Sequence, residues 1–294
     1  MKILITGGNG QLAFDCNEIL KKKYEVLSHN HKEMDISDFG HAENVINSFK
    51  PNIILNCAAY TKVDACETEK DLAWEVNVIG PKNLAEISEI LGCKIVHIST
   101  DYVFNGKKKP PEYYVEDDTP DPLTYYGKTK LEGELAIQKA TNSYAIIRTA
   151  WLYGIRGHNF LKSILKLCSK NPQKGVKVVN DQFGSMTSTY KLALQIEKII
   201  EIGGKGTYHA TSEGHSSWFE AAGYFLKKFG IPYQVFPCST KEYPTPAHRP
   251  ANSILENKRL KEEGINLMSH WEDDLEQFVS KFRERLLKET TKVN

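Results

Sequence analysis

The chain has 294 residues, enough for one large domain or two modest domains that each bury a core. It carries 38 Lys and Arg residues against 37 Asp and Glu residues. So small a net charge creates no overall field to attract nucleic acid or an anionic membrane, and we expect neither as a partner. No stretch approaches the ~20 consecutive apolar residues of a membrane span.

The cysteines are spread along the chain and form no C-x-x-C pair; they stand at 16, 57, 66, 93, 168 and 238. In a chain of this size, such spacing suits reduced thiols rather than a disulfide framework. The apolar run in "MKILITGG" reaches glycines after a few residues, too soon for the apolar core of a signal peptide. We therefore expect a cytoplasmic protein.

Short apolar runs alternate with stretches of helical period through the first half. The runs predicted as strands are 2–6, 24–28, 52–59, 94–100 and 144–150. The expected helices between them are 11–23, 38–49, 68–91 and 122–140. Unbroken β-branched runs are typical of parallel strands that helices cover on both faces. The pattern predicts the α/β class, with a doubly wound, Rossmann-like parallel sheet over residues 1–150.

After residue 150 the rhythm loosens. Further helices are expected at 157–170, 189–202, 216–229, 256–263 and 271–288. Short strands are expected near 176–179, 207–210 and 233–236. We predict a smaller α/β lobe over residues 151–294, interleaved with segments that return to the first domain.

A glycine-rich turn directly follows the first strand. The stretch "TGGNGQLA" carries Gly7 and Gly10, with Ala13 where a third glycine often stands. Between a strand and a helix, such glycines allow a tight turn and close approach of the backbone to a pyrophosphate, which the helix N-terminus then faces. We predict that the first domain binds a dinucleotide.

The end of the second predicted strand bears on the choice of dinucleotide. An acidic residue there usually holds the ribose 2′-hydroxyl. Here the strand ends on uncharged or basic residues, which are Ser28, His29, Asn30, His31 and Lys32. With no carboxylate to repel a 2′-phosphate, we expect NADPH to be accepted at least as well as NADH. Asn30, Asp35 and Ile36 are the expected contacts at this end, with Asp35 and Ile36 near the adenine.

Two tyrosines and two lysines lie together in "YYGKTK". Side chains four residues apart share a helix face, so Tyr126 pairs with Lys130, whereas Tyr125 has Thr129 at that spacing. Asp121 is the expected helix cap, with Pro122 at the first helical position.

A tyrosine has a pKa near ~10, and acid–base work at pH 7 requires about 4 kcal/mol of stabilisation of the phenolate. An ammonium one turn away and the helix N-terminus both act in that direction. The pair Tyr126 and Lys130 is therefore a candidate for proton transfer.

The motifs together resemble the extended short-chain dehydrogenase/reductase family, and within it the dTDP-4-dehydrorhamnose reductases. The stretches that carry the resemblance span most of the chain: "TGGNGQLA" at 6–13, "MDISD" at 34–38, "NCAAYTKVDACE" at 56–67, "HISTDYVFNG" at 97–106, "YYGKTKLEGE" at 125–134, "RTAWLYG" at 148–154, "VVNDQFGSMTS" at 178–188 and "YPTPAHRPANS" at 243–253.

The resemblance implies a role for each matching residue. Tyr126 would donate the proton, Lys130 would be its partner and a ribose ligand, and Thr100 would hydrogen-bond the reacting oxygen. The cofactor would further meet Gly7, Gly10, Gln11, Leu12, Ala58, Ala59, Tyr60 and Thr61. The sugar would lie among Thr100, Asp101, Tyr126 and Trp151. Arg249 is a candidate clamp for the substrate diphosphate, because a guanidinium matches phosphate oxygens in pairs.

The implied reaction is hydride transfer from NADPH or NADH to the C4 ketone of a dTDP-activated 4-keto-6-deoxyhexose. Relatives that dehydrate sugars carry an acid directly after the Thr-Asp pair, where this chain has Tyr102, so reduction is favoured. Some relatives hold magnesium between subunits through carboxylates. The segment 185–191 has none, so we expect no metal there and leave a homodimer open.

Two alternatives stay open. A related nucleotide-sugar C4 epimerase would reuse the same tyrosine and lysine. A non-catalytic, NADP-binding regulatory subunit resembling the beta subunit of methionine adenosyltransferase would use the same frame to bind a partner, although Tyr126, Lys130 and Thr100 together argue against it.

Overall fold

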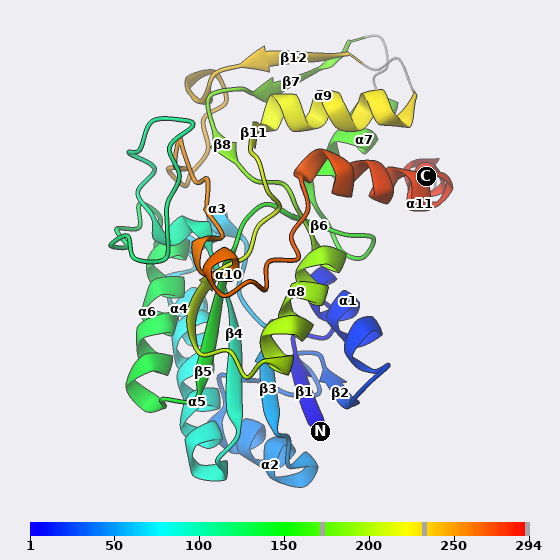
Figure 1. Cartoon of the computed structure of the whole chain (residues 1–294). Coiled ribbons are helices and arrows are strands. Elements are labelled where there is room, and N and C mark those ends of the chain that lie inside the picture. Colours follow the sequence, from blue (N-terminus) through cyan, green and yellow to red (C-terminus); the bar gives the residue numbers. More distant parts are fainter. Residues whose placement is uncertain (171–173, 231–233, 292–294) are drawn as a thin grey trace.

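A six-stranded parallel sheet forms the centre of the first domain (Figure 1). The structure is a computed structural model that describes residues 1–170, 174–230 and 234–291. The strands, in spatial order, are β10 (Gly206–His209), β5 (Tyr144–Thr149), β4 (Lys94–Thr100), β3 (Ile53–Asn56), β1 (Lys2–Thr6) and β2 (Glu25–His29). The predicted α/β class with a parallel central sheet is confirmed.

Helices cover both faces of this sheet, as its apolar strands require. One face packs against α1 (Gln11–Leu20) and α8 (Thr189–Glu201). The other packs against α2 (Phe39–Phe49), α5 (Gly80–Leu91) and α6 (Tyr125–Ala140). Because α8 and β10 come from beyond residue 150, the second half of the chain helps to build the first sheet.

The strand order reverses direction beside β1. From β1 the chain moves outward to β2, then returns to β3 on the other side of β1. In open α/β sheets, ligands bind at the carboxyl ends of the two strands where the order reverses. The loops that follow β1 and β3 therefore border the expected crevice.

The predicted helix 68–91 is divided into parts. A short helix α3 (Val63–Cys66) precedes α4 (Lys70–Trp74), and a π-helical turn (Glu75–Ile79) joins α4 to α5. Such π turns are often found at functional sites. The π turn places Asn77 in the interior, against the loop that follows β3.

The start of α6 differs from the prediction. The helix begins at Tyr125, and Thr124 caps it by accepting a hydrogen bond from the Gly127 N–H. Asp121, the predicted cap, instead accepts a hydrogen bond from the Asn105 amide at 2.8 Å. The predicted start at Pro122 with an Asp121 cap is wrong, because a tertiary contact outside the helix holds that carboxylate.

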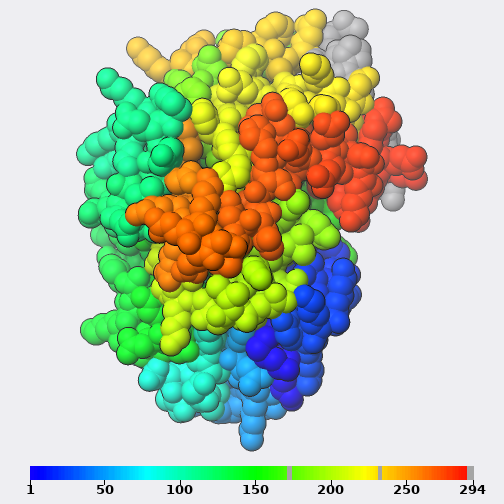
Figure 2. All heavy atoms as spheres, viewed as in Figure 1, coloured from blue at the N-terminus to red at the C-terminus, as the bar shows by residue number. Residues whose placement is uncertain are grey.

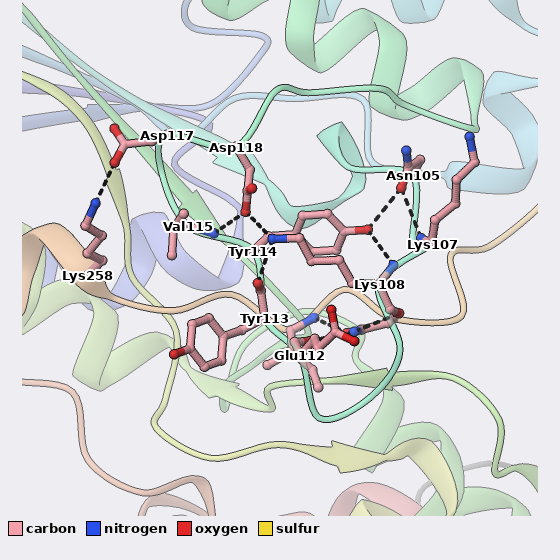
Figure 3. A network of polar contacts seen from close by, with 12 residues as sticks. Asn105, Lys107, Lys108, Glu112, Tyr113, Tyr114, Val115, Asp117, Asp118 and Lys258 are labelled. Atoms are coloured by element: carbon pink, nitrogen blue, oxygen red, sulfur yellow. Dashed lines mark hydrogen bonds and ion pairs between the residues drawn. The ribbon is translucent and has the colours of Figure 1, made fainter.

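The segment between β4 and α6 is fixed by polar contacts (Figure 3). The Tyr114 N–H donates to the Ile254 carbonyl at 2.8 Å, and the Tyr114 hydroxyl donates to Asn105 Oδ1 at 3.0 Å. Asp117 pairs with Lys258 at 2.6 Å. Residues 105–118 are thus bound to the segment that precedes and begins α10 (Lys258–Glu262). These contacts fix the path of the backbone that leads into α6.

The second half also forms a smaller lobe, at the top of Figures 1 and 2. Its helices are α7 (Phe160–Lys170), α9 (Trp218–Phe229) and α11 (Trp271–Thr291). Its strand pairs are β7 (Val176–Val179) with β12 (Val235–Cys238), β8 (Phe183–Gly184) with β11 (Ser216–Ser217), and β6 (Leu152–Tyr153) with β9 (Thr187–Ser188). The strand predicted near 233–236 begins at Val235, and residue 233 lies outside the described residues.

Across the described ranges, no helix is both long and apolar enough to cross a membrane.

Candidate active site

The glycine turn after β1 has the geometry that a dinucleotide requires. Gly7 has a φ of +69°, and a Cβ there would lie 2.8 Å from the Ala58 backbone nitrogen. The Gly10 N–H closes the turn on the Gly7 carbonyl at 2.7 Å. Gly10 is also the N-cap of α1 and offers no side chain to cap it. The residues present therefore fit a pyrophosphate, because the turn is tight and no side chain covers the helix start.

The two residues after Gly10 are held by the protein itself. The Gln11 amide donates to the Leu152 carbonyl at 3.2 Å, which ties the start of α1 to the smaller lobe. The Leu12 side chain is buried in the core between α1 and the sheet. Only the backbone of Leu12 is therefore left to meet a ligand.

A carboxylate does reach the end of β2, contrary to the expectation. Glu33 accepts a hydrogen bond from the Asn30 N–H at 2.8 Å and lies 3.6 Å from His29 Nδ1. The turn is closed by the Glu33 N–H, which donates to the Asn30 carbonyl at 3.1 Å. The sequence argument missed Glu33 because it stands four residues beyond the strand, and only the turn folds it back.

Asp35 and Ile36 turn toward the protein. One Asp35 oxygen accepts hydrogen bonds from the Ser37 N–H at 3.0 Å and from the Ser37 hydroxyl at 2.7 Å. Ile36 is buried and faces Gly80, where an added Cβ would lie 2.5 Å from Ile36 Cδ1. The Ile36 side chain is therefore part of the core under α5.

Asn77 clamps the loop that follows β3. Its Oδ1 accepts from the Tyr60 N–H at 2.8 Å, and its Nδ2 donates to the Tyr60 carbonyl at 3.1 Å and to Thr129 Oγ1 at 3.1 Å. This fixes the backbone from Ala59 to Thr61, whose side chain is exposed. Sequence reasoning missed Asn77; the signal was a polar residue on the buried face of an amphipathic helix.

Tyr126 lies in the first turn of α6, close to the end of β4. The Thr100 hydroxyl, at the end of β4, interacts with the Tyr126 phenol. Tyr102 packs edge-on against the Tyr126 ring, with ring centroids 5.7 Å apart. Gly127 allows this approach, because a Cβ there would lie 2.1 Å from the Tyr102 carbonyl oxygen. The structure therefore brings Thr100 and Tyr126 together, as the sequence predicted.

The expected lowering of the Tyr126 pKa is absent. Burial raises the pKa of Tyr126, and the charge of Asp101 adds to this, while the hydrogen bond with Thr100 opposes it. Lys130 donates instead to the Ile98 carbonyl at 2.7 Å and lies 3.1 Å from His97 Nε2. Burial lowers the pKa of Lys130 to about 8. Helical spacing did place the two residues on one side of α6, but the ammonium is directed to β4.

Asp101 is buried beside Thr100. The Thr100 hydroxyl donates to Asp101 Oδ1 at 3.0 Å. Burial raises the pKa of Asp101 to about 6, although hydrogen bonds from Ser253 and Thr100 oppose the rise. A carboxyl group with this pKa exchanges its proton within the physiological range.

Trp151 lies between the two halves of the chain with a backbone φ of 48°, which is strained for a bulky residue. Its indole stacks on Trp218, with centroids 3.5 Å apart and planes within 7°. It also closes on Gly184, where an added Cβ would lie 2.5 Å from the indole. Trp151 and Trp218 thus form a stacked aromatic pair where the smaller lobe joins the first domain.

Arg249 forms a two-point ion pair with Asp64 of α3, with nitrogen–oxygen distances of 3.1 and 2.9 Å. The Ala247 N–H donates to the same carboxylate at 3.2 Å. The expected diphosphate clamp is therefore occupied by a carboxylate that joins the segment 243–253 to the first domain. Among the described residues, no three His, Cys, Asp or Glu side chains gather as a metal site requires.

Comparison with known proteins identifies the family. Residues 1–284 match the family described as "RmlD substrate binding domain". The chain belongs to this family. This confirms the resemblance drawn from the motifs.

Relatives of known name agree with this assignment. The chain is 39% identical over 279 residues to the spore coat polysaccharide biosynthesis protein SpsK of Bacillus subtilis, covering 95% of this chain and 96% of that protein. It is 32% identical over 287 residues to the dTDP-4-dehydrorhamnose reductase of Escherichia coli, covering 92% and 95%.

Solved structures of relatives also resemble the structure of this chain. A dTDP-4-dehydrorhamnose reductase from Clostridium acetobutylicum superposes with a TM-score of 0.93 at 42% identity, covering 96% of this chain and 100% of that one. The enzyme of that name from Bacillus anthracis, solved in complex with NADP, gives a TM-score of 0.91 at 39% identity, covering 95% and 99%. Three of these four relatives are thus named dTDP-4-dehydrorhamnose reductases, and one of the solved structures holds NADP.

Proposed function

We propose that this protein reduces the C4 ketone of a dTDP-4-keto-6-deoxyhexose with NADPH or NADH, converting dTDP-4-dehydro-L-rhamnose to dTDP-L-rhamnose for polysaccharide synthesis. The observation that carries the proposal is the meeting of Tyr126 and Thr100 at the carboxyl end of β4, beside the loops where the strand order reverses. The named relatives support the substrate class, a dTDP-activated sugar.

Residues 1–150 would hold the coenzyme, which supplies a hydride when bound. Gly7, Gly10 and the backbone of Gln11 and Leu12 would surround its pyrophosphate. The adenosine end would meet Asn30, Asp35 and the Ile36 backbone. The loop clamped by Asn77, with Ala58, Ala59, Tyr60 and Thr61, would lie along the nicotinamide side together with Lys130.

Tyr126 would give its proton to the ketone oxygen as negative charge develops there, while the Thr100 hydroxyl would turn from Asp101 to donate its hydrogen bond to the same oxygen. Because burial raises the pKa of Tyr126, the phenol keeps its proton at neutral pH and is available as an acid. The phenolate left after transfer is costly in so dry a site, so Lys130 would have to be charged to stabilise it.

The smaller lobe, which contains α7, α9 and α11, would hold the nucleotide sugar together with residues of the first domain. Asp101, directly after β4, would bind a sugar hydroxyl, and Trp151 would offer an aromatic face. Arg249 would exchange the Asp64 carboxylate for the substrate diphosphate, because both present oxygens to the same guanidinium fork.

We further propose a cytoplasmic enzyme that uses neither nucleic acid nor a membrane as a partner. The balanced charge and the six free cysteines support this. A homodimer is the assembly to test by light scattering.

A single assay separates this function from the alternatives. Purified protein is mixed with NADPH and an enzymatically made dTDP-4-keto-hexose, and the absorbance of the reduced nicotinamide is followed. Steady oxidation with a C4-reduced product supports the reductase. Tightly bound but inert coenzyme would instead indicate a regulatory subunit, and C4 inversion without net oxidation an epimerase.

A further inference from the structure

A chain of buried polar groups leads from the sheet to Lys130. Thr6 Oγ1 donates to Asn56 Oδ1 at 2.6 Å, Asn56 Nδ2 lies 2.9 Å from His97 Nδ1, and His97 Nε2 lies 3.1 Å from Lys130 Nζ. Each of these residues is at most 1% exposed. Thr6, Asn56 and His97 are direct neighbours across β1, β3 and β4. Because these four side chains are shielded from solvent, each of their hydrogen bonds must be made with another member of the series or with the neighbouring backbone.

A backbone amide fixes the orientation of the first link. The Ala58 N–H donates to Asn56 Oδ1 at 3.1 Å. A backbone N–H is always a donor, so the atom that faces it must be the amide oxygen of Asn56. With its oxygen held by Ala58 and Thr6, Asn56 presents its NH2 group to His97.

The orientation of Asn56 selects one tautomer of His97. Nδ1 must accept the hydrogen bond from the Asn56 NH2 group, so the single hydrogen of a neutral imidazole is on Nε2. Nε2–H then points at Lys130 Nζ and needs an acceptor. An uncharged amine has one lone pair to accept it, whereas an ammonium has none.

Resting on the proposed role of Lys130, we propose that Asn56 and His97 are positioning residues that favour the uncharged amine of Lys130, so that this lysine exchanges its proton near neutral pH. The amine accepts from His97 Nε2–H and still donates to the Ile98 carbonyl at 2.7 Å. Both contacts are satisfied at once only in the uncharged form.

The other groups around Lys130 oppose this preference only in part. Glu134 on the same helix and Cys57 in the loop after β3 both favour the charged form. Glu134 itself accepts hydrogen bonds from Arg148 of β5 at 2.7 and 3.0 Å. The arginine charge offsets much of the negative charge that Glu134 presents to Lys130. Burial nevertheless lowers the pKa of Lys130. Burial also lowers the pKa of His97, and the positive charge of Lys130 adds a smaller effect in the same direction.

This arrangement has a consequence for the reaction. In the proposed reaction the phenolate of Tyr126 needs a charged Lys130, so the rate would fall as pH rises through the titration of this lysine. A chain that favours the amine brings that fall close to neutral pH. Reversing the His97 tautomer moves the fall to higher pH.

Asn56→Asp reverses the chain with a minimal change of shape. An aspartate accepts from Ala58, from Thr6 and also from His97 Nδ1–H, which leaves Nε2 free to accept from an ammonium. The alkaline limb of log(kcat/KM) against pH is expected to move upward by about one unit or more. His97→Gln, whose carbonyl accepts from the ammonium, is expected to move it the same way and serves if Asn56→Asp folds poorly.

A second readout needs neither coenzyme nor activity. In ligand-free protein labelled with 15N-histidine, NMR is expected to show His97 with Nε2 protonated and Nδ1 bare from pH 6 to pH 9. In Asn56→Asp the proton is expected on Nδ1. A bare Nε2 in the wild type at any of these pH values would overturn the inference, whether or not the protein is a reductase.

Thr6→Val is the matched control, because it removes a hydroxyl from the same chain but leaves the Ala58 amide to orient Asn56. The tautomer and the alkaline limb are expected to stay as in the wild type. If Thr6→Val shifted both as far as Asn56→Asp does, the orientation of Asn56 would not be their cause and the inference would fall.

Discussion

At the scale of single residues, the site depends on which of two adjacent tyrosines enters the interior. Tyr126 is buried against Thr100 and Tyr102, whereas the ring of Tyr125 lies under Lys70, 5.4 Å from its ammonium nitrogen. Their positions differ because successive residues of a helix point about 100° apart. Identical chemistry is therefore separated by one position in the sequence.

Tyr126→Phe is expected to reduce kcat by about 100-fold or more, since the proton donor is removed while the ring remains. Coenzyme affinity, measured by fluorescence titration, should change little. Tyr125→Phe is the matched control and should retain most of the rate. Equal losses in the two variants would contradict the assignment of the donor.

Glu33 is expected to set the coenzyme preference. Its carboxylate lies at the end of β2, where it favours a ribose hydroxyl and repels a 2′-phosphate. Glu33→Gln should raise the ratio of kcat/KM for NADPH over NADH by about tenfold, or ~1.4 kcal/mol. Glu25→Gln, at the opposite end of the same strand, should leave the ratio unchanged. If both ratios moved alike, net charge rather than position would be responsible.

Asp101 is expected to reduce stability at neutral pH. Burial raises the pKa of Asp101 to about 6 in the folded protein, against about 3.9 for an exposed aspartate. The folded state therefore binds the proton more tightly and loses stability as pH rises from about 4 to 6. Asp101→Asn should therefore raise the free energy of unfolding at pH 7.5 by about 2 kcal/mol, and by well under about 1 kcal/mol at pH 4. Urea denaturation at the two pH values measures this difference. A gain independent of pH would show that the carboxyl is not the cause.

At the scale of elements, α6 is positioned by two glycines where other backbone comes close. A Cβ at Gly127 would lie 2.1 Å from the Tyr102 carbonyl oxygen, and one at Gly133 would lie 2.2 Å from that of Asn77. Because neither carbonyl can yield easily, the glycines fix how near the helix lies to β4 and to the π turn. Tyr126 reaches Thr100 only because α6 packs this closely.

Gly127→Ala is expected to push the start of α6 away from Tyr102. It should lower the free energy of unfolding by about 2–3 kcal/mol and reduce kcat in addition. The control is Gly223→Ala in α9, whose Cβ would meet only Val235 at 4.0 Å and should stabilise the protein by about 0.5 kcal/mol. Chemical denaturation of both variants measures the difference; similar effects of either sign would reject the packing argument.

The sequence predicted these elements well wherever one segment decides its own structure. The strands and the body of the helix predicted over 122–140 follow from local periodicity, although the helix begins at Tyr125, and the shared face of Tyr126 and Lys130 follows from helical spacing. What it missed depends on partners distant in the chain. Asp121 binds Asn105 rather than capping α6, Lys130 turns to His97, and Glu33 is folded back by a turn. A polar His97 in a strand buried on both faces was a readable sign of such a partner, as was Asn77 on the buried face of a helix.

At the scale of the whole molecule, contacts between distant segments connect the candidate site to residues 243–253 and to β6. Arg249 and Asp64 join residues 243–253 to α3, and Gln11 joins α1 to Leu152 of β6. The Arg249 guanidinium is partly exposed, so the pair itself adds little to stability. Its value would instead be in holding the guanidinium where a diphosphate arrives.

Arg249→Gln is expected to raise KM for the nucleotide sugar roughly tenfold or more, because a charged hydrogen bond worth about 1.5–3 kcal/mol is lost. The KM for coenzyme and the melting temperature should change little. Lys258→Gln, which removes the ion pair with Asp117, is the control and should leave both KM values as they are. A lower melting temperature with an unchanged sugar KM would make Arg249 a structural tie instead.

The return of the chain to its first sheet limits how this protein can be divided. Leu192, Ile196 and Ile199 of α8, with Leu260 further on, cover one face of the strands built before residue 150, and β10 shields the outer edge of β5. A fragment ending at residue 150 would expose both an apolar face of the sheet and the unpaired edge of β5 to water, and we expect it to precipitate when expressed. We therefore expect that the two halves of the chain cannot be produced separately. A split version would have to be cut in a surface loop, with both pieces expressed together.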